Sequence, residues 1–306
     1  MVTKFDQILI INKMLRFKTA FILVLLFLFS GYSYGQRYTY KKKFSTQKNA
    51  MYFFWGYNRA IYTKSDINFW GPNYNFTVLK ATAKDRPSNE FRTYVNPATI
   101  SVPQFNIRLG WYYKERWDWS IGYDHMKYVM RDWQEAYITG YVNGTTTSQL
   151  NGTYTKDDGK ILIRPQDLHY ENTNGLNYCS VQLNNTAPIW KTNNGKFAIM
   201  RRVGGGLGFL ITQTDFNWDG KDYHSTFKFS GWGISAHAGI RLDFFNRFFI
   251  LNNFQTGYIN LPKNATIQHQ GTYAKQDFLY GTWQITGGVL WYLRSKNSCD
   301  TCPDWH

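Results

Sequence analysis

After residue 30 the sequence of 306 residues has no apolar run long enough for a membrane-spanning helix, which takes about 20 such residues. It also has only three cysteines, no repeat of fixed period and no zinc-finger or RNA-binding signature. The formal net charge is +15 without any basic helix, so nucleic acid is a poor explanation for it. The charge fits either a solvated basic surface or attraction to lipid phosphates or anionic polysaccharide. We expect no nucleic-acid partner and no cofactor.

The N-terminal segment has the layout of a secretory signal peptide. Basic residues precede an apolar run at 20–29, which is too short to span a bilayer as a helix. Ser33 and Gly35 supply the small residues that precede a cleavage site. We therefore expect a signal peptide at 1–35, followed by a basic periplasmic segment at 36–49.

Residues 105–123 contain one alternating pattern twice, around a short turn. In 105–113 the odd positions are apolar or aromatic, and the even positions include asparagine, arginine and glycine; the pattern resumes at Trp117. Alternation with period 2 places one set on each face of a strand. An apolar face with aromatic ends, opposite a face of glycines and charges, is typical of a transmembrane barrel with lipid outside and a polar lumen. Aromatic residues make up 19% of a chain that is polar on average, which suits a wall where every second residue meets lipid.

The spacing of the strand candidates predicts the topology. Eight segments show the alternation: 51–61, 105–113, 117–123, 170–184, 197–212, 227–244, 248–259 and 278–293. Short links at 114–116, 192–195 and 245–247 alternate with long polar links at 62–102, 131–169, 214–226 and 260–277. Outer-membrane barrels have short periplasmic turns and longer external loops.

We therefore predict an all-β protein, an eight-stranded antiparallel up-and-down transmembrane β-barrel at 50–293, in the cell outer membrane with both termini in the periplasm. A Cys-containing periplasmic tail follows at 294–306. The alternative is ten strands, because 70–84 also alternates. We interpret that region as a hairpin that extends the barrel wall outside the membrane.

Three segments carry a family resemblance. Residues 52–59 (YFFWGYNR), 102–106 (VPQFN) and 122–130 (GYDHMKYVM) resemble outer-membrane β-barrel proteins of the Bacteroidetes lineage. The resemblance covers most of the mature chain, and the architecture is similar to small OmpA-, OmpX- and OmpW-type barrels. It implies an outer-membrane location and a barrel fold. Because the family has no established activity, it implies no catalytic residues.

The inward-facing set contains the charged candidates. An eight-stranded barrel has an interior just wide enough for side chains to fill it, and buried charges must be paired. The residues that we expect to form a lumen charge network are Arg108, Asp118, Asp124, Arg202, His237, Arg241 and Asp243. We expect Asp118 and Asp124 to meet Arg108, Arg202 or Arg241. The network is either a structural plug or a gate for protons or ions through a narrow pore.

Two short motifs have both a metal or redox interpretation and a plainer one. Asp215, Asn217 and Asp219 match the opening of a calcium loop, but position twelve is threonine and the flanks are strands, so a polar external turn is the alternative. Cys299 and Cys302 follow the last strand with too few neighbouring donors for a metal site. We expect a local disulfide there in an oxidising periplasm, and no metal.

The function hypotheses come from three classes. The leading one is a structural or surface-binding protein that acts through long external loops, with outer-membrane lipid, other outer-membrane proteins or surface polysaccharide as partners. The second is a narrow channel for small or apolar solutes. The third is a lipid-modifying hydrolase, for which His125 and the pair His224–Ser225 are the histidines to test. Alternation places Asp124 on the face opposite His125, so we expect no enzyme and no catalytic residues.

Overall fold

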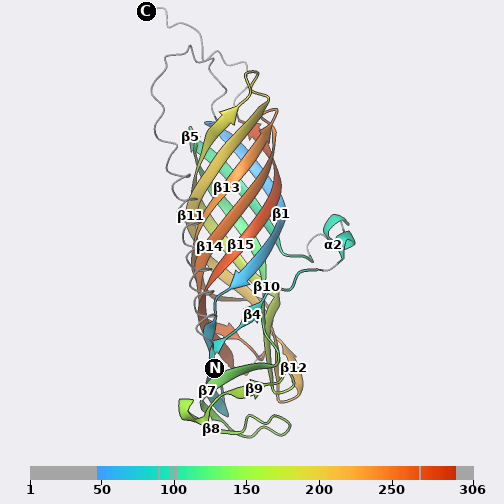
Figure 1. The fold of residues 1–306 in the computed structure, drawn as a ribbon, viewed down its shortest axis with the longest axis vertical. Helices are drawn as coiled ribbons and strands as arrows, with labels where there is room; N and C mark the ends of the chain where they lie inside the picture. Colours follow the sequence, from blue (N-terminus) through green and yellow to red (C-terminus); the bar gives the residue numbers. More distant parts are fainter. Residues whose placement is uncertain (1–46, 89, 97, 100–101, 269, 294–306) are drawn as a thin grey trace, which may run out of the picture. The chain divides into compact units, whose positions relative to one another are not determined.

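The computed structural model describes residues 47–88, 90–96, 98–99, 102–268 and 270–293. Eight antiparallel strands close into a ring, because the first strand pairs with both the second and the last (Figure 1). In spatial order the ring consists of β1 (Ala50–Tyr62), β5 (Phe105–Lys114), β6 (Trp117–Met130), β10 (Leu168–Lys191), β11 (Phe197–Trp218), β13 (Lys228–Phe244), β14 (Phe248–Ala265) and β15 (Tyr273–Tyr292). The predicted antiparallel all-β fold is confirmed, and each ring strand overlaps one of the predicted segments.

The three predicted short links are confirmed as tight turns at one end of the ring. They connect β5 to β6, β10 to β11 and β13 to β14. In the last turn Phe245 and Asn246 have φ angles of 53° and 54°. Positive φ at both central residues is the hairpin geometry that matches the twist of the flanking strands. Ala50 pairs with Tyr292 at this same end, so the ring begins and finishes beside its tight turns.

At the opposite end the wall continues beyond the ring, and we call this part the extension (Figure 1). It contains the far ends of several ring strands together with β2 (Ser65–Gly71), β3 (Tyr74–Ala81), β4 (Ala83–Lys84), β7 (Gln134–Val142), β8 (Gly152–Tyr154), β9 (Ile161–Ile163), β12 (Lys221–His224) and the 3-10 helix η2 (Lys156–Asp158). A single α-helical turn, α2 (Phe91–Val95), lies in the connection between β4 and β5. Among the described residues, no helix is long and apolar enough to cross a membrane.

The region at 70–84 stays out of the ring. β2 and β3 form a hairpin, and β2 pairs with the first residues of β15, so the hairpin widens the wall of the extension. This agrees with the predicted hairpin and leaves no place for it as a ninth and tenth ring strand. β3 pairs in turn with β7, which carries β8 and β9.

The prediction of long polar links at 214–226 and 260–277 is wrong. β11 continues to Trp218 and turns back as β12, while β14 reaches Ala265 and β15 begins at Tyr273. The sequence looks polar there because the outward-facing residues are polar. The inward-facing apolar residues, such as Phe216, Trp218 and Leu261, pack in a core together with buried polar groups such as Asn264.

The apolar side chains change faces along the ring strands. In the ring part of β11, Leu207 and Phe209 point outward and are 69% and 46% exposed. Further along the same strand Phe216 and Trp218 point inward and are 2% and 7% exposed. β6 shows the same change between exposed Ile121 and fully buried Tyr128. The ring is therefore apolar outside and polar inside except for an apolar layer near the tight turns, whereas the extension has the usual arrangement of a water-soluble sheet.

The inward-facing apolar residues of the extension form one packed core. Aromatic rings dominate it: Phe69 lies 5.3 Å from Phe76 and 5.7 Å from Phe216 between ring centroids, and Phe76 lies 5.4 Å from Trp218. Complete burial of a phenylalanine side chain stabilises a fold by about 1.5–3 kcal/mol. The core reaches down to Tyr178 and Tyr280, which stand at the mouth of the ring.

Candidate functional site

The lumen of the ring contains all seven residues of the predicted charge network, and all are buried. Near the tight turns Arg202 on β11 forms an ion pair with Asp118 on β6, with N–O distances of 2.9 and 3.2 Å. Asn184 and the hydroxyl of Tyr52 each donate to the same carboxylate, both at 2.6 Å. The buried Asp118 carboxylate therefore has a positive partner and hydrogen-bond donors within the protein. Removal of one partner from such a buried pair typically costs about 3–5 kcal/mol.

A second ion pair lies in the same layer and belongs to a single strand. Arg241 and Asp243 on β13 are joined by two parallel hydrogen bonds of 2.7 and 2.8 Å, the geometry that guanidinium and carboxylate prefer. Arg241 also donates to the hydroxyl of Tyr112 at 2.8 Å, and its guanidinium lies 4.9 Å from the centre of the Phe249 ring. Aromatic and apolar side chains thus pack around the two arginines at this end of the lumen. They are Ala50, Tyr52, Phe54, Tyr112, Phe249, Leu251 and Leu290.

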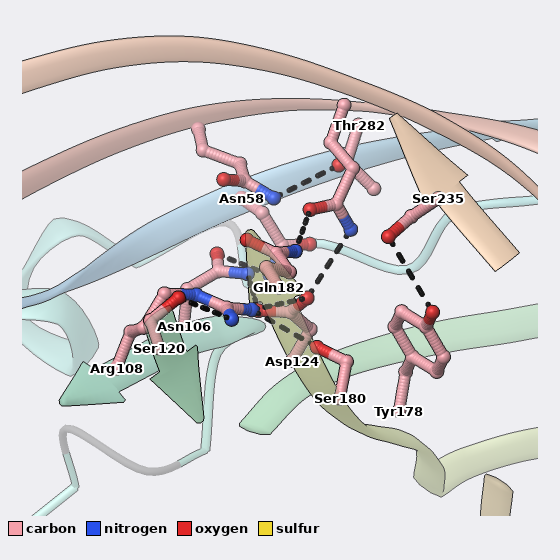
Figure 2. A network of polar contacts seen from close by, with 12 residues as sticks. Asn58, Asn106, Arg108, Ser120, Asp124, Tyr178, Ser180, Gln182, Ser235 and Thr282 are labelled. Carbon is pink, nitrogen blue, oxygen red and sulfur yellow. Dashed lines mark hydrogen bonds and ion pairs between the residues drawn. The ribbon is translucent and has the colours of Figure 1, made fainter. Parts of the chain in front are cut away.

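The middle of the lumen is a layer of neutral polar groups around one ion pair (Figure 2). Arg108 on β5 lies 3.5 Å from Asp124 on β6, and the guanidinium also donates to Ser180 at 3.1 Å. The Asp124 carboxylate accepts a hydrogen bond from Asn106 at 2.6 Å and another from Gln255 at 3.2 Å. The predicted pairing of both aspartates with lumen arginines thus appears as Asp118 with Arg202 and Asp124 with Arg108.

Among the described residues, His237 is the member of the network without a hydrogen-bond partner. Both imidazole nitrogens are buried and unpaired. The ring lies in the row that also contains Gly204 and Gln255 of the neighbouring strands. The side chain therefore belongs to the lumen by position, but the structure does not bring it into an ion pair.

The tyrosines of the lumen were missed by the sequence reasoning. Tyr52 and Tyr112 bind the two arginines of the turn-end layer, and Tyr178 donates to the carbonyl of Gly233 at 3.2 Å near the mouth. The available signal was their position: each has the same parity as inward residues of its own strand. Tyrosine is also common on the lipid face, so residue type alone does not show whether a tyrosine faces the lumen or the lipid.

Glycines make room for the largest lumen side chains. A Cβ atom at Gly122 would lie 2.4 Å from the guanidinium carbon of Arg108, and one at Gly110 would lie 2.1 Å from the ring of Tyr52. The run at 204–208 lies within β11, where a Cβ at Gly204 would lie 2.6 Å from the side-chain oxygen of Asn184. Close approach of facing side chains therefore accounts for these glycines.

The residues of the calcium motif lie along the end of β11 and have separate partners. Asp215 lies 2.7 Å from the imidazole of His224, and Asn217 donates to Asp222 at 2.7 Å. Asp219 accepts backbone N–H groups from the loop at 146–148 at 2.6–3.1 Å. Although burial opposes the shift, these hydrogen bonds lower the pKa of Asp219 well below its ordinary value. In the described part of the chain, no group of three histidine, cysteine or acidic side chains is arranged for a metal ion.

The cysteines and histidines complete the set of sequence candidates. Cys299 and Cys302 lie outside the described residues, and Cys179 is a free thiol on the outer face of β10. His125 bonds to Asn177 at 2.7 Å, and His224 bonds to Asp215, while the hydroxyl of Ser225 accepts the N–H of Thr214. Of the described histidines, none has a hydroxyl or thiol as a hydrogen-bond partner. The structure therefore does not assemble the histidine candidates into a nucleophile–base pair.

No protein-family model and no curated protein matches the chain. Among solved structures, the outer membrane protein OprG from Pseudomonas aeruginosa is similar at a TM-score of 0.36 and 12% identity, over 81% of this chain and 100% of OprG. The attachment invasion locus protein Ail of Yersinia pestis is similar at 0.32 and 11%, over 80% and 99% of the two chains. Neisserial surface protein A is similar at 0.34 and 8%, over 79% and 99%. Scores this low support no conclusion about function.

Proposed function

We propose that this chain is an integral outer-membrane protein whose ring spans the bilayer and whose extension stands in water on the outer side. The observation that carries the proposal is the change of faces along single strands, from exposed Leu207 to buried Trp218. A strand keeps its apolar residues on the side away from water. The switch therefore marks the level at which the surroundings of the wall change from lipid to water. Tryptophans at the turn end, such as Trp117 and Trp190, fit the aromatic girdle of the opposite interface.

The lumen supports a structural role better than transport. Its charges are paired, the aromatic layer around Phe249 closes one end, and the core of the extension covers the other. We expect purified protein in a planar bilayer to give no conductance steps. The matched comparison is Arg202→Ala, which opens the turn-end layer, against Arg201→Ala on the outer face of the same strand. Steady conductance of the unaltered protein would favour the narrow channel instead.

A binding surface is available on the outer face of the extension. Trp70 on β2 and Tyr141 on β7 are exposed and belong to one row across the sheet, because both pair with Asn75 of β3. Trp70 also stacks on Tyr273 with a centroid distance of 5.2 Å. Exposed aromatic faces beside amide groups provide apolar contact area together with hydrogen bonding. This combination suits the C–H faces and hydroxyls of a sugar, so we assign surface polysaccharide as the partner.

Photo-crosslinking in intact cells tests the binding role. A photoreactive residue in place of Tyr141 should form adducts with surface polysaccharide, and Trp70→Ala should reduce their yield. The same photoreactive residue in place of Asp157, which is exposed on η2 away from the aromatic row, is the control. Adducts with another outer-membrane protein would overturn polysaccharide as the partner, and a chain without any adduct would overturn the binding role.

A further inference from the structure

The connection between β4 and β5 forms an arm whose two ends are fixed to β1; the structure describes residues 86–88, 90–96, 98–99 and 102–103 of it. At its start the carboxylate of Asp85 accepts the N–H of Ala60 at 3.0 Å. At its end the carbonyl of Gln104 accepts the N–H of Asn58 at 3.2 Å, and the Gln104 side chain donates to Asp85. Both ends of the arm are thereby fixed to the same part of β1. Its base has a defined place on the ring wall.

The helical turn of the arm stands to the side of the ring (Figure 1), and its Tyr94 reaches the outer face of β1. Tyr57 donates to the carbonyl of Tyr94, and the two rings meet edge to face at 4.9 Å. Arg59 donates to the Tyr94 hydroxyl at 2.9 Å and lies 5.6 Å from its ring centre. Tyr57 follows Phe53 and Trp55 along the lipid-facing side of β1, and Arg59 comes next. Tyr94 therefore attaches α2 near the extension end of this apolar row, where Ile61 is the last exposed apolar residue of β1. We call the exposed apolar outer face of the ring the apolar belt.

The arm exposes apolar side chains near this end of the apolar belt. Phe91, Val95 and Val102 are 78%, 58% and 52% exposed. Apolar side chains gathered on a segment of this length normally mark an interaction surface. Two exposed cations, Arg59 and Arg92, stand beside them. Apolar groups next to arginines match the boundary between acyl chains and phosphate headgroups.

We propose that α2 is an interfacial anchor that places Phe91 and Val95 among the acyl chains of the outer leaflet, with Arg59 and Arg92 at the lipid phosphates. The proposal rests on the membrane location of the ring proposed above. A protein partner is less favoured because the arm is attached at the edge of the lipid-facing belt, and its exposed apolar residues continue that belt.

Site-directed spin labelling tests the anchor in the full chain. The three cysteines are replaced by serine, and a nitroxide is attached to Phe91→Cys, to Ile121→Cys on the belt, or to Asp157→Cys in the extension. The proteins are reconstituted into vesicles of phosphatidylethanolamine and phosphatidylglycerol. Collision rates are measured with oxygen, which concentrates in the bilayer, and with a nickel chelate, which stays in water. We expect the oxygen-to-nickel ratio at position 91 to be several-fold above that at 157 and closer to that at 121.

The outcomes separate the anchor from the membrane location. A label at 91 that matches 157, while 121 remains lipid-exposed, overturns the anchor and leaves the membrane ring intact. A label at 121 that matches 157 overturns the proposed function itself. Protection of 91 from both reagents means protein contact and also overturns the anchor. Arg92→Glu should shift the ratio at 91 toward water, and an unchanged ratio overturns the role of the phosphates.

Discussion

His169 connects the far end of β10 to the link between β6 and β7. Its Nδ1 lies 2.6 Å from the carboxylate of Asp132, and its Nε2 lies 3.2 Å from that of Glu171. The hydrogen bond to Glu171 raises the pKa of His169; burial opposes this, and Asp132 adds to it. Burial would raise the pKa of Glu171, but the bonds from His169 and Thr173 and the charge of Arg86 lower it overall. Because both nitrogens face carboxylates, the doubly protonated imidazolium satisfies this site.

A pH dependence follows from the direction of these shifts. The stabilisation from His169 is complete below about pH 6.5, the ordinary pKa of histidine, and is lost as the pH rises through the higher pKa of the folded state. The stabilisation from Glu171 is present above its ordinary pKa of 4.5 and is lost only as the pH falls through the lower folded value. We therefore expect the thermal stability of the extension to fall as the pH rises above about 6.5. His169→Gln should flatten this dependence.

The control for this prediction is His224→Gln. His224 also pairs with a carboxylate, that of Asp215, but it is exposed and water screens the interaction. Its removal should leave the pH profile of unfolding nearly unchanged. Identical profiles for the unaltered protein and His169→Gln would show that the pairing of His169 with Asp132 and Glu171 contributes nothing to stability.

At this scale the sequence predicts the face of a residue but not its partner. Alternation alone placed Asp118 and Arg202 in the lumen, and both are there. Their contact crosses from β6 to β11 with β10 between them, so it depends on the stagger of three strands. Period 2 carries no information about that stagger. For the same reason, alternation does not predict that Arg241 bonds to Asp243 of its own strand.

At the scale of the strand, the face switch predicts where a charge is tolerated. Leu207 lies on the outer face of β11 within the apolar belt, and Gln213 lies on the same face beyond it. A lysine near the bilayer midplane of a barrel wall costs about 2–4 kcal/mol, whereas near the interface it costs about 0–1 kcal/mol. We expect Leu207→Lys to destabilise the protein in lipid vesicles by the larger amount and Gln213→Lys by the smaller. Reversible urea unfolding in the vesicles measures both, and equal losses would contradict a lipid-facing belt.

The same switch explains which elements the sequence reveals. The eight ring segments were recognised because their aromatics alternate with glycines and charges over long stretches. In β11 the apolar positions change from odd, as in Phe209, to even, as in Phe216, and the outward residues become polar. This change of parity was present in the sequence. Alternation predicts a polar link there only if each face of a strand meets the same surroundings along its whole length. β7 and β9 were missed for another reason, because their pairing depends on contacts distant in the chain.

For the whole molecule, the arrangement of turns and sheets predicts its orientation in the membrane. The tight turns and both ends of the described ring lie at one end, while the extension with its own core lies at the other. Barrels of the outer membrane have short periplasmic turns and larger external parts. We therefore expect the extension to face the outside of the cell and Asn193, in the turn between β10 and β11, to face the periplasm.

Labelling of single cysteines in intact cells tests this orientation. In a background with Cys179, Cys299 and Cys302 changed to serine, a membrane-impermeant maleimide should label Asp157→Cys on whole cells. It should label Asn193→Cys only after the outer membrane is permeabilised. Both positions are exposed, so a difference in labelling reflects the side of the membrane. Labelling of Asn193→Cys alone on intact cells would mean the opposite orientation. Labelling of both would mean that the bilayer does not separate the two ends of the ring, and the membrane proposal would then fail together with the anchor that depends on it.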